Sequence, residues 1–346
     1  MKIFKVLSLF FVAITYVSCS NHSDTAKRIG YDGDLYGNIE QLTITEHSLT
    51  TKFGETRIDT TLTMTVISFN PNGDVSKVEE YEPFTTLIEE GTWKGTHLPN
   101  KRLISVSKYT YDDDSLTKFD RYDKNGELSY SILYSYSESG KLIEKTQYSS
   151  NGDIDYKIQY YYSDDLLAEV ESSFYETEYS LNNGKVEKNQ RESCLRTMYT
   201  YQYDKRNKLL HKDEVQYYKH DIKIERCDTT VLSYDYDAKG NLVLESRFDE
   251  SLVYPSVVCK NYYNKQFKLV ESVQLNNLGE IQSKYTFHYD KKKRLIEKNE
   301  YGPKDEFICK WVCENDNHGN IIRITKFEGV LQTPTLLVKT DFVYRK

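Results

Sequence analysis

The chain has 346 residues and a mass of 40.7 kDa, enough for one large domain or two ordinary ones. A formal charge of −7 and a pI near 5.7 exclude the basic footprint of a nucleic-acid-binding protein. The 31 Tyr and 14 Phe favour strands and there are only four Ala, so a helix-rich fold is excluded too.

The first residues have the features of a secretory signal. Lys2 and Lys5 precede an apolar run from Val6 to Ile14, and small residues around Ser18 follow it. This run is too short to cross a bilayer as a permanent helix, and no later segment approaches the roughly 20 apolar residues that such a helix needs. Removal of the signal also removes both lysines, which changes the formal charge from −7 to −9.

The exit of this signal contains a cysteine. Val17-Ser18-Cys19 resembles the lipobox of bacterial lipoproteins, although Tyr16 stands where that family usually has Leu. The resemblance implies a lipoprotein signal peptide over residues 1–18 and a lipid on Cys19, in preference to an ordinary signal that contains a Cys. It also implies attachment to the cell envelope, with Ser20 compatible with the outer membrane and the periplasmic or surface face left open. Residues 19–30 are polar and are expected to form a tether.

A short unit recurs through the rest of the chain. It consists of an aromatic anchor, a few polar residues, often Gly, one spacer and an aliphatic residue. The copies are Phe69-NPNGD-Val75, Tyr122-DKNGE-Leu128, Tyr136-SESGK-Leu142, Tyr148-SSNGD-Ile154, Tyr236-DAKGN-Leu242, Leu275-NNLGE-Ile281 and, with Asn as anchor, Asn315-DNHGN-Ile321. Tyr203-DKRNK-Leu209 and Tyr289-DKKKR-Leu295 are degenerate copies without Gly.

The unit has the chemistry of a hairpin turn. Asp, Asn and Ser bond their own backbone, Gly accepts a positive φ, and four polar residues ending in Gly fit a type I turn with a G1 bulge. Between turns the chain alternates, as from Leu128 to Tyr136, which predicts strands with one apolar face. From Tyr263 the anchors step by 12, 14, 12 and 14 residues to Asn315, which describes a two-strand unit.

These turns resemble those of the YD-repeat, or Rhs-like, family, in which Tyr-Asp precedes a Gly turn. The dipeptide stands at 31–32, 111–112, 122–123, 203–204, 234–235, 236–237 and 289–290. No Asp-Pro-x-Gly core and no toxin domain are present, so the resemblance implies a short YD-repeat lipoprotein. We expect an all-β, antiparallel β-meander of repeated hairpins, curled into a shell, an incomplete barrel or two packed layers. It would form a single domain over residues 31–346, with a loop insertion at 83–101.

The sequence predicts no catalytic residue, no metal site and no cofactor. Its seven His form no metal-ligand motif, and phosphate-binding and nucleophile motifs are absent. Five Cys remain after Cys19, and we expect them to be buried thiols rather than metal ligands. They are Cys194, Cys227, Cys259, Cys309 and Cys313. The last two are four apart on one strand and cannot bond each other, and a bond between Cys194 and Cys227 is disfavoured by two intervening strand spacings.

Three aromatic residues lie off the repeat pattern and form the predicted binding surface. They are Trp93 in the insertion, Tyr161 beside two other Tyr, and Tyr262 beside Tyr263. The leading hypothesis is a non-catalytic, lipid-anchored envelope protein that binds another envelope protein or a polysaccharide. The alternatives are an envelope hydrolase that acts on glycan or peptide through a carboxylate pair, and an immunity or antitoxin protein.

Overall fold

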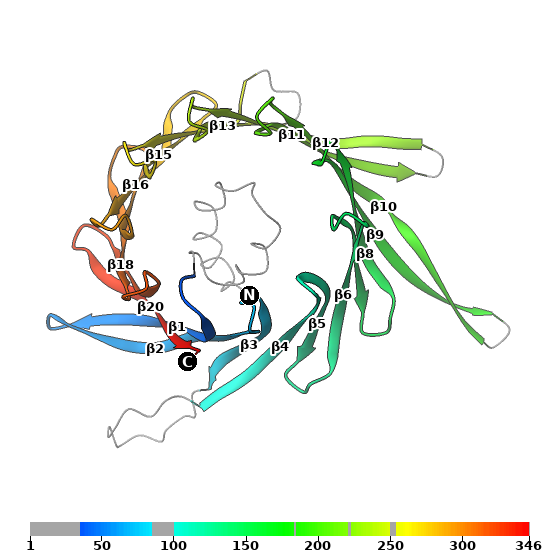
Figure 1. The fold of residues 1–346 in the computed structure, drawn as a ribbon, viewed down its shortest axis with the longest axis horizontal. Coiled ribbons are helices and arrows are strands. Elements are labelled where there is room, and N and C mark those ends of the chain that lie inside the picture. Colours follow the sequence, from blue (N-terminus) through cyan, green and yellow to red (C-terminus); the bar gives the residue numbers. More distant parts are fainter. Residues whose placement is uncertain (1–34, 85–99, 183–184, 221–222, 250–253, 346) are drawn as a thin grey trace. The chain divides into compact units, whose positions relative to one another are not determined.

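Strands make up every regular element that the structure, a computed structural model, describes (Figure 1). The described residues are 35–84, 100–182, 185–220, 223–249 and 254–345. The predicted all-β class is confirmed. The strands are β1 (Ile39–Lys52), β2 (Glu55–Phe69), β3 (Val75–Phe84), β4 (Asn100–Asp112), β5 (Ser115–Asp123), β6 (Leu128–Tyr136), β7 (Leu142–Ser149), β8 (Ile154–Ser163), β9 (Leu166–Asn182), β10 (Lys185–Tyr203), β11 (Leu209–His220), β12 (Lys223–Tyr236), β13 (Leu242–Asp249), β14 (Val257–Tyr263), β15 (Leu269–Asn276), β16 (Ile281–Tyr289), β17 (Leu295–Tyr301), β18 (Phe307–Asn315), β19 (Ile321–Glu328) and β20 (Thr333–Tyr344).

The strands form two compact units where the sequence predicted one domain. Unit 1 contains the described residues of 1–109, 121–127 and 283–346, and unit 2 contains those of 110–120 and 128–282. Unit 1 has the strand order β16-β17-β18-β19-β20-β1-β2-β3-β4, with every neighbour antiparallel. Its sheet therefore joins the last strand to the first, seen in Figure 1 as red β20 beside blue β1.

Unit 2 is a simple antiparallel meander from β6 to β15. This confirms the predicted chain of hairpins. Because consecutive strands run in opposite directions, all turns from an even-numbered to an odd-numbered strand lie at one end of a unit's strands. We call these even-to-odd turns and call those at the other end odd-to-even turns.

The Gly turns close as the sequence predicts. In the turn from β12 to β13, the Asp237 N–H donates to the Asn241 carbonyl at 2.9 Å, and the Gly240 N–H donates to the Asp237 carbonyl at 3.0 Å. The Asp237 carboxylate accepts the N–H groups of Lys239 and Asn241 at 2.9 and 2.8 Å. Gly240 has a φ of 86°, and the strand register shifts beside Tyr236, which is the expected bulge.

The degenerate turns adopt this geometry without glycine. Asn207 and Lys293 occupy the glycine position with φ values of 59° and 64°. Asn tolerates this left-handed region, whereas Lys is strained there. The repeat therefore extends to turns in which the Gly signal is lost.

The anchor residues connect neighbouring strands by one recurrent hydrogen bond. At the ends of four even-numbered strands, the anchor side chain donates to the carbonyl of a Leu at the start of the preceding strand. The bonds run from Tyr136 Oη to Leu116 O at 2.8 Å, from Tyr162 Oη to Leu142 O at 2.9 Å, from Tyr263 Oη to Leu242 O at 2.9 Å and from Asn315 Nδ2 to Leu295 O at 3.2 Å. Asn315 thus replaces the aromatic anchor by making the same bond.

The predicted apolar face needs a correction, because lysines lie among its tyrosines. In unit 2, Lys145 on β7 is paired with Tyr134 on the neighbouring strand β6. Its ammonium lies 5.7 Å from the ring centroid of Tyr156. Lys212 is paired with Tyr201, and its ammonium lies 4.5 Å from the Tyr199 ring centroid. The aromatic faces attract these cations, and the lysine stems cover apolar surface, so a strict apolar alternation is not needed.

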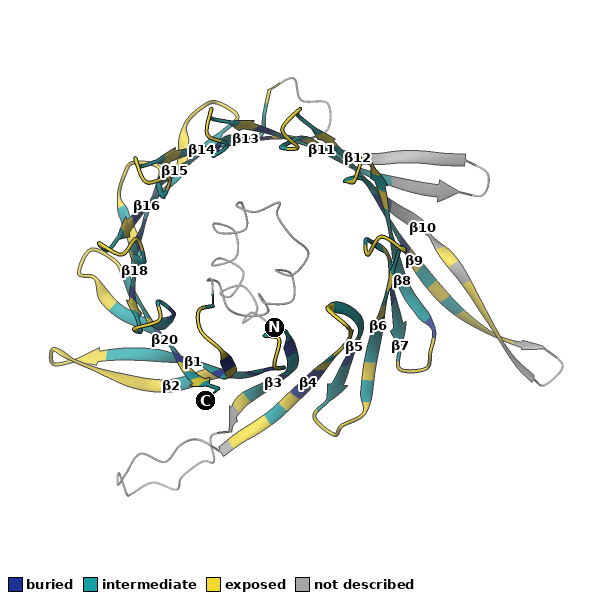
Figure 2. Cartoon of the chain, viewed as in Figure 1, coloured by how far each residue is buried: buried dark blue, intermediate teal, exposed yellow. Residues whose placement is uncertain are grey.

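The best-buried apolar side chains are in unit 1. They come from β1, β2 and β3 and form one cluster that includes Leu42, Ile67 and Val75, each at most 1% exposed. Residues at the turns are largely exposed (Figure 2). The hydrophobic core therefore lies beside the pairing of the first and last strands.

Several sequence predictions concern residues at or beyond the limits of the described ranges. The loop insertion predicted at 83–101 is wrong at its ends, since Pro83 and Phe84 belong to β3, and Asn100 and Lys101 belong to β4. Backbone pairing between these residues extends the hairpin further than their polarity suggested. Residues 85–99, the signal peptide and the tether lie outside the described residues.

Candidate functional site

The structure separates the predicted binding residues. Tyr161 on β8 is 43% exposed and Tyr262 on β14 is 48% exposed, which confirms that both project from the sheet. Six strand positions separate β8 from β14, or about 29 Å at the usual strand spacing. Trp93 lies outside the described residues. Tyr161 and Tyr262 therefore do not form one site.

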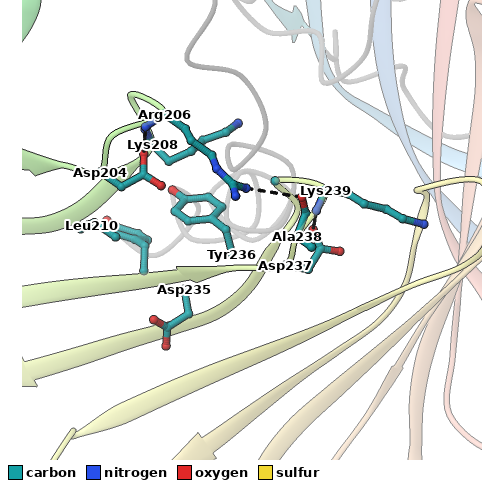
Figure 3. Close-up of a pocket in the computed structure, with 11 residues that line it drawn as sticks. Asp204, Arg206, Lys208, Leu210, Asp235, Tyr236, Asp237, Ala238 and Lys239 are labelled. Atoms are coloured by element: carbon teal, nitrogen blue, oxygen red, sulfur yellow. Dashed lines mark hydrogen bonds between the residues drawn. The ribbon is translucent and has the colours of Figure 1, made fainter.

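A cleft lies between two YD turns of unit 2 (Figure 3). Its volume is about 500 Å³, and it lies between the even-to-odd turns 204–208 and 237–241. Tyr236 stands between the turns, with the Lys208 ammonium 5.7 Å from its ring centroid. Arg206 reaches across and donates to the Ala238 carbonyl at 3.5 Å.

The charges of this cleft suit binding better than proton transfer. Arg206, Lys208 and Lys239 supply three cations. Hydrogen bonds from turn amides and side chains hold the pKa values of Asp204 and Asp237 below their usual range, so both are ionised at neutral pH. A general acid would need a raised carboxyl pKa. Asp235 also lines the cleft, so three acidic side chains balance the three cations. The cleft can thus offer groups of both charges and one aromatic ring to a hydroxyl-rich ligand.

The charge of the last residue in the described five-residue turns depends on the turn's position in the meander. In unit 2 the even-to-odd turns of five residues end on Lys141, Lys208, Asn241 and Lys268, whereas the odd-to-even turns end on Asp153 and Glu280. In unit 1 the former end on Asp74, Arg294 and Asn320, and the latter on Glu127 and Glu306. Apart from Asp74, the carboxylates at the last position of these turns lie at the odd-to-even end, whereas Asp204, Asp237, Asp290 and Asp316 stand at the first position of even-to-odd turns. The two-residue even-to-odd turns are Asp113-Asp114 and Asp164-Asp165. This pattern is visible in the sequence once the turns are sorted by position.

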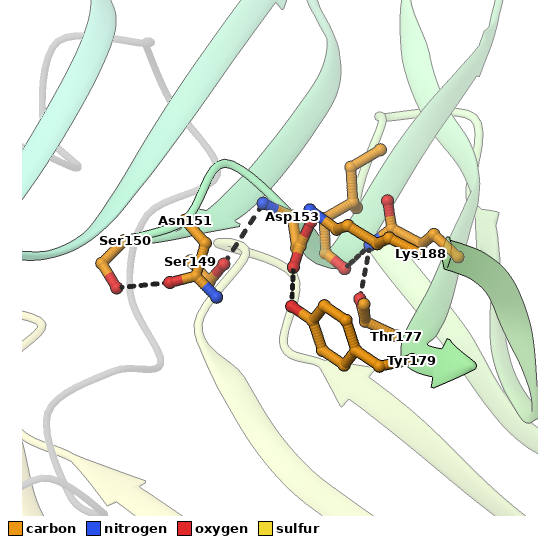
Figure 4. A network of polar contacts seen from close by, with 9 residues as sticks. Ser149, Ser150, Asn151, Asp153, Thr177, Tyr179 and Lys188 are labelled. Atoms are coloured by element: carbon orange, nitrogen blue, oxygen red, sulfur yellow. Dashed lines mark hydrogen bonds and ion pairs between the residues drawn. The ribbon is translucent and has the colours of Figure 1, made fainter. Parts of the chain in front are cut away.

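A second polar cluster in unit 2 has a structural role (Figure 4). Asp153 is 6% exposed, forms an ion pair with Lys188 on β10 and accepts a long hydrogen bond of 3.5 Å from the Tyr179 hydroxyl on β9. Gln190 donates to the Ile154 carbonyl at 2.6 Å. These contacts attach the long β9–β10 hairpin to the turn between β7 and β8.

The densest polar network joins the two ends of the described chain in unit 1. Asn320, which is fully buried, accepts the Tyr36 N–H at 2.7 Å and donates to the Tyr36 carbonyl and the Tyr344 hydroxyl, each at 2.8 Å. The Tyr344 hydroxyl donates to Asp316 at 2.5 Å, and the Arg345 N–H donates to the Asn38 carbonyl at 2.8 Å. We call this network the terminal clasp. Sequence reasoning missed it because Asn320 looks like any other turn residue.

The cysteines whose side chains the structure describes form no disulfide. Cys309 and Cys313 are buried, whereas Cys259, predicted to be buried, is only half-buried. Burial raises the pKa of both Cys309 and Cys313 to about 12, so they are neutral thiols. β11 separates β10 from β12, the strands that carry Cys194 and Cys227, whose side chains lie outside the described residues.

The part of the chain that the structure describes holds no group of three side chains suited to a metal ion. Within those same residues, no helix is long and apolar enough to cross a membrane.

The fold and its clefts define an all-β protein of antiparallel hairpin repeats. No protein-family model and no curated protein match the chain. Among solved structures it is similar to a porin-like protein from Bacteroides uniformis, with a TM-score of 0.33 and 10% identity. The similarity covers 89% of this chain and 99% of that one.

Proposed function

We propose that this protein is a non-catalytic, lipid-anchored protein of the bacterial cell envelope that uses a YD-repeat β scaffold to bind an envelope protein or a polysaccharide. The observation that carries the proposal is that different positions of the repeat have different roles, some structural and some exposed. The Asp and anchor residues that define the repeat are used to close turns and join strands. The variable turn positions and exposed ring faces remain available for a partner.

The lipid anchor follows from Cys19 and is tested by labelling. Cells that express the full chain are fed a clickable fatty acid, and membranes are separated by centrifugation. Cys19→Ala should abolish the label and release the protein from the membrane fraction. The matched control Cys259→Ala, at a half-buried thiol in the folded domain, should keep both label and membrane association. Label on the Cys19→Ala protein, or its unchanged pelleting, would refute the lipid anchor.

The location of the partner is tested by protease treatment of intact cells, with lysed cells as the control. Cleavage in intact cells would place the domain at the surface and point to an external glycan or protein. Protection until lysis would place it in the periplasm and direct the search to envelope partners by crosslinking. Single substitutions at Tyr161, Tyr262, Trp93 and Arg206 would then show whether partner binding depends on the predicted aromatic residues or on the cleft that contains Arg206.

A further inference from the structure

The turn from β16 to β17 presents consecutive lysines to solvent. Lys291, Lys292 and Lys293 are all exposed, and none forms an ion pair with another described residue. The neighbouring carboxylate of Asp290 is already bound by Arg294, whose Nε lies 2.6 Å from Asp290 Oδ2. Because Asp290 is neutralised within the turn, the lysines leave a net positive surface.

This turn is connected to the place where the described chain begins. Arg294 donates from Nη1 to the Asp316 carbonyl at 3.1 Å, and Asp316 opens the turn that holds the terminal clasp. Asn320 in that turn holds both backbone groups of Tyr36. The two turns are both even-to-odd and lie two strands apart, which is about 10 Å. The chain therefore enters unit 1 beside the lysines.

The opposite end of unit 1 has the opposite character. Its turn from β17 to β18 ends on Asp305 and Glu306, and β19 ends on Glu328. Asp305 and Glu328 form ion pairs with Lys284 and Lys326, which leaves Glu306 as the carboxylate of this group without an ion pair to another described residue. Asp74 is the carboxylate that ends an even-to-odd turn in this unit, and it lies in a different turn from the lysines. An anionic surface would attract the lysine end and repel the carboxylate end.

We propose that the lysine-bearing turn of unit 1, residues 290–294, contacts the anionic phospholipid headgroups of the membrane to which the chain is anchored. This rests on the proposed lipid anchor, from which the stretch between Cys19 and Leu35 can reach at most about 55 Å. A polybasic patch beside a lipid-modified residue gives a second membrane signal. The contact would orient unit 1 with its even-to-odd turns toward the bilayer.

The proposal is tested on the chain from Ser20 onward, which lacks the anchor and keeps every described residue. Binding is measured by sedimentation with vesicles of phosphatidylcholine containing about 30% phosphatidylglycerol. We expect binding to these vesicles, no binding to pure phosphatidylcholine, and loss of binding in high salt. The double substitution Lys291→Gln and Lys292→Gln should weaken binding about 25-fold, since each lysine near an anionic surface contributes roughly 5-fold.

The matched control changes the same net charge at the other end of unit 1. Lys52→Gln with Lys304→Gln, both at exposed positions, should bind within about 2-fold of the parent. Equal loss in both variants, or no vesicle binding at all, would overturn the proposal. Binding to soluble polygalacturonate through the same lysines without vesicle binding would assign the surface to an acidic polysaccharide instead. Because this assay omits Cys19, its outcome is independent of the labelling test of the anchor.

Discussion

One side-chain oxygen organises each YD turn. The oxygen of Asp204, Asp237 or Asn264 accepts two backbone N–H groups within its own turn, at 2.7 to 3.0 Å. Asp and Asn are therefore interchangeable in geometry but differ in charge. This difference makes the turns sensitive to acid.

We expect the Asp turns to lose stability at low pH. Hydrogen bonds lower the pKa values of Asp204, Asp237 and Asp290 in the folded state. A lowered folded-state pKa adds stability above the unfolded value of about 3.9, and that stability is lost as the pH falls through the folded value. The triple Asp→Asn variant cannot ionise at these positions, so it should melt below the parent at pH 7 and show a smaller fall in Tm between pH 5 and pH 3. Parallel melting curves for the two proteins would contradict this explanation.

The phenol of an anchor residue has a separate, measurable role. Tyr162→Phe keeps the ring and removes the hydrogen bond to the Leu142 carbonyl, so it should reduce the free energy of unfolding by about 1 kcal/mol. Tyr161→Phe is the matched control because that ring is exposed and the hydrogen bond from its hydroxyl to Glu171 is long, at 3.4 Å. Its effect should stay within about 0.5 kcal/mol. Urea titrations of both proteins give the comparison.

Hairpins are the elements that the repeat encodes, and their turns depend on one left-handed residue. Gly140 has a φ of 79°, and a methyl group added there would meet no other atom within 4 Å, so Gly140→Ala tests backbone strain without a steric clash. We expect a loss of about 1–2 kcal/mol. Lys293→Gly, at a φ of 64°, should have the opposite sign and stabilise the fold by about 0.5–1 kcal/mol. Thermal melts that show the same sign for both changes would refute the shared turn geometry.

At the scale of the whole molecule, the terminal clasp holds the first described residues against the last strands. Asn320→Ala would leave the buried N–H and carbonyl of Tyr36 without their partner, so we expect a loss of about 3 kcal/mol. Hydrogen exchange should quicken first in β1 and β20. Asn317→Ala, at an exposed position in the same turn, is the control and should leave exchange unchanged. Equal protection in both variants would show that the clasp does not hold these strands.

The turns and strand alternation were predictable because their causes are local. The Tyr122 and Tyr236 motifs carry their own turn chemistry, and alternation from Leu128 to Tyr136 follows from the strand period of two. Asn315 could also be placed, since it stands where an aromatic residue stands elsewhere. Local signals of this kind predicted the all-β meander.

The long-range features could not be predicted in the same way. β1 pairs with β20 and brings together residues such as Leu42 and Phe342. The alternation of apolar and polar residues in one strand does not indicate which other strand it pairs with. The sequence did not predict the lysines that lie among the tyrosines. A lysine such as Lys145 looks the same in the sequence whether its ammonium contacts an aromatic ring or solvent. Tyr161 and Tyr262 were correctly expected to project, but their separation depends on the number of strands between them.

The joining of β1 to β20 has a consequence for the order of synthesis. Ile39 is made long before its partner Tyr344, since about 300 residues separate them in the sequence. Until then β1 has only β2 beside it, and its other edge is open to foreign strands. A chain interrupted before β20 would leave β1 and β19 each with an unpaired edge, so incomplete copies should aggregate or be degraded rather than accumulate as shorter folded forms. β1 gains its second neighbour only once β20 has been made.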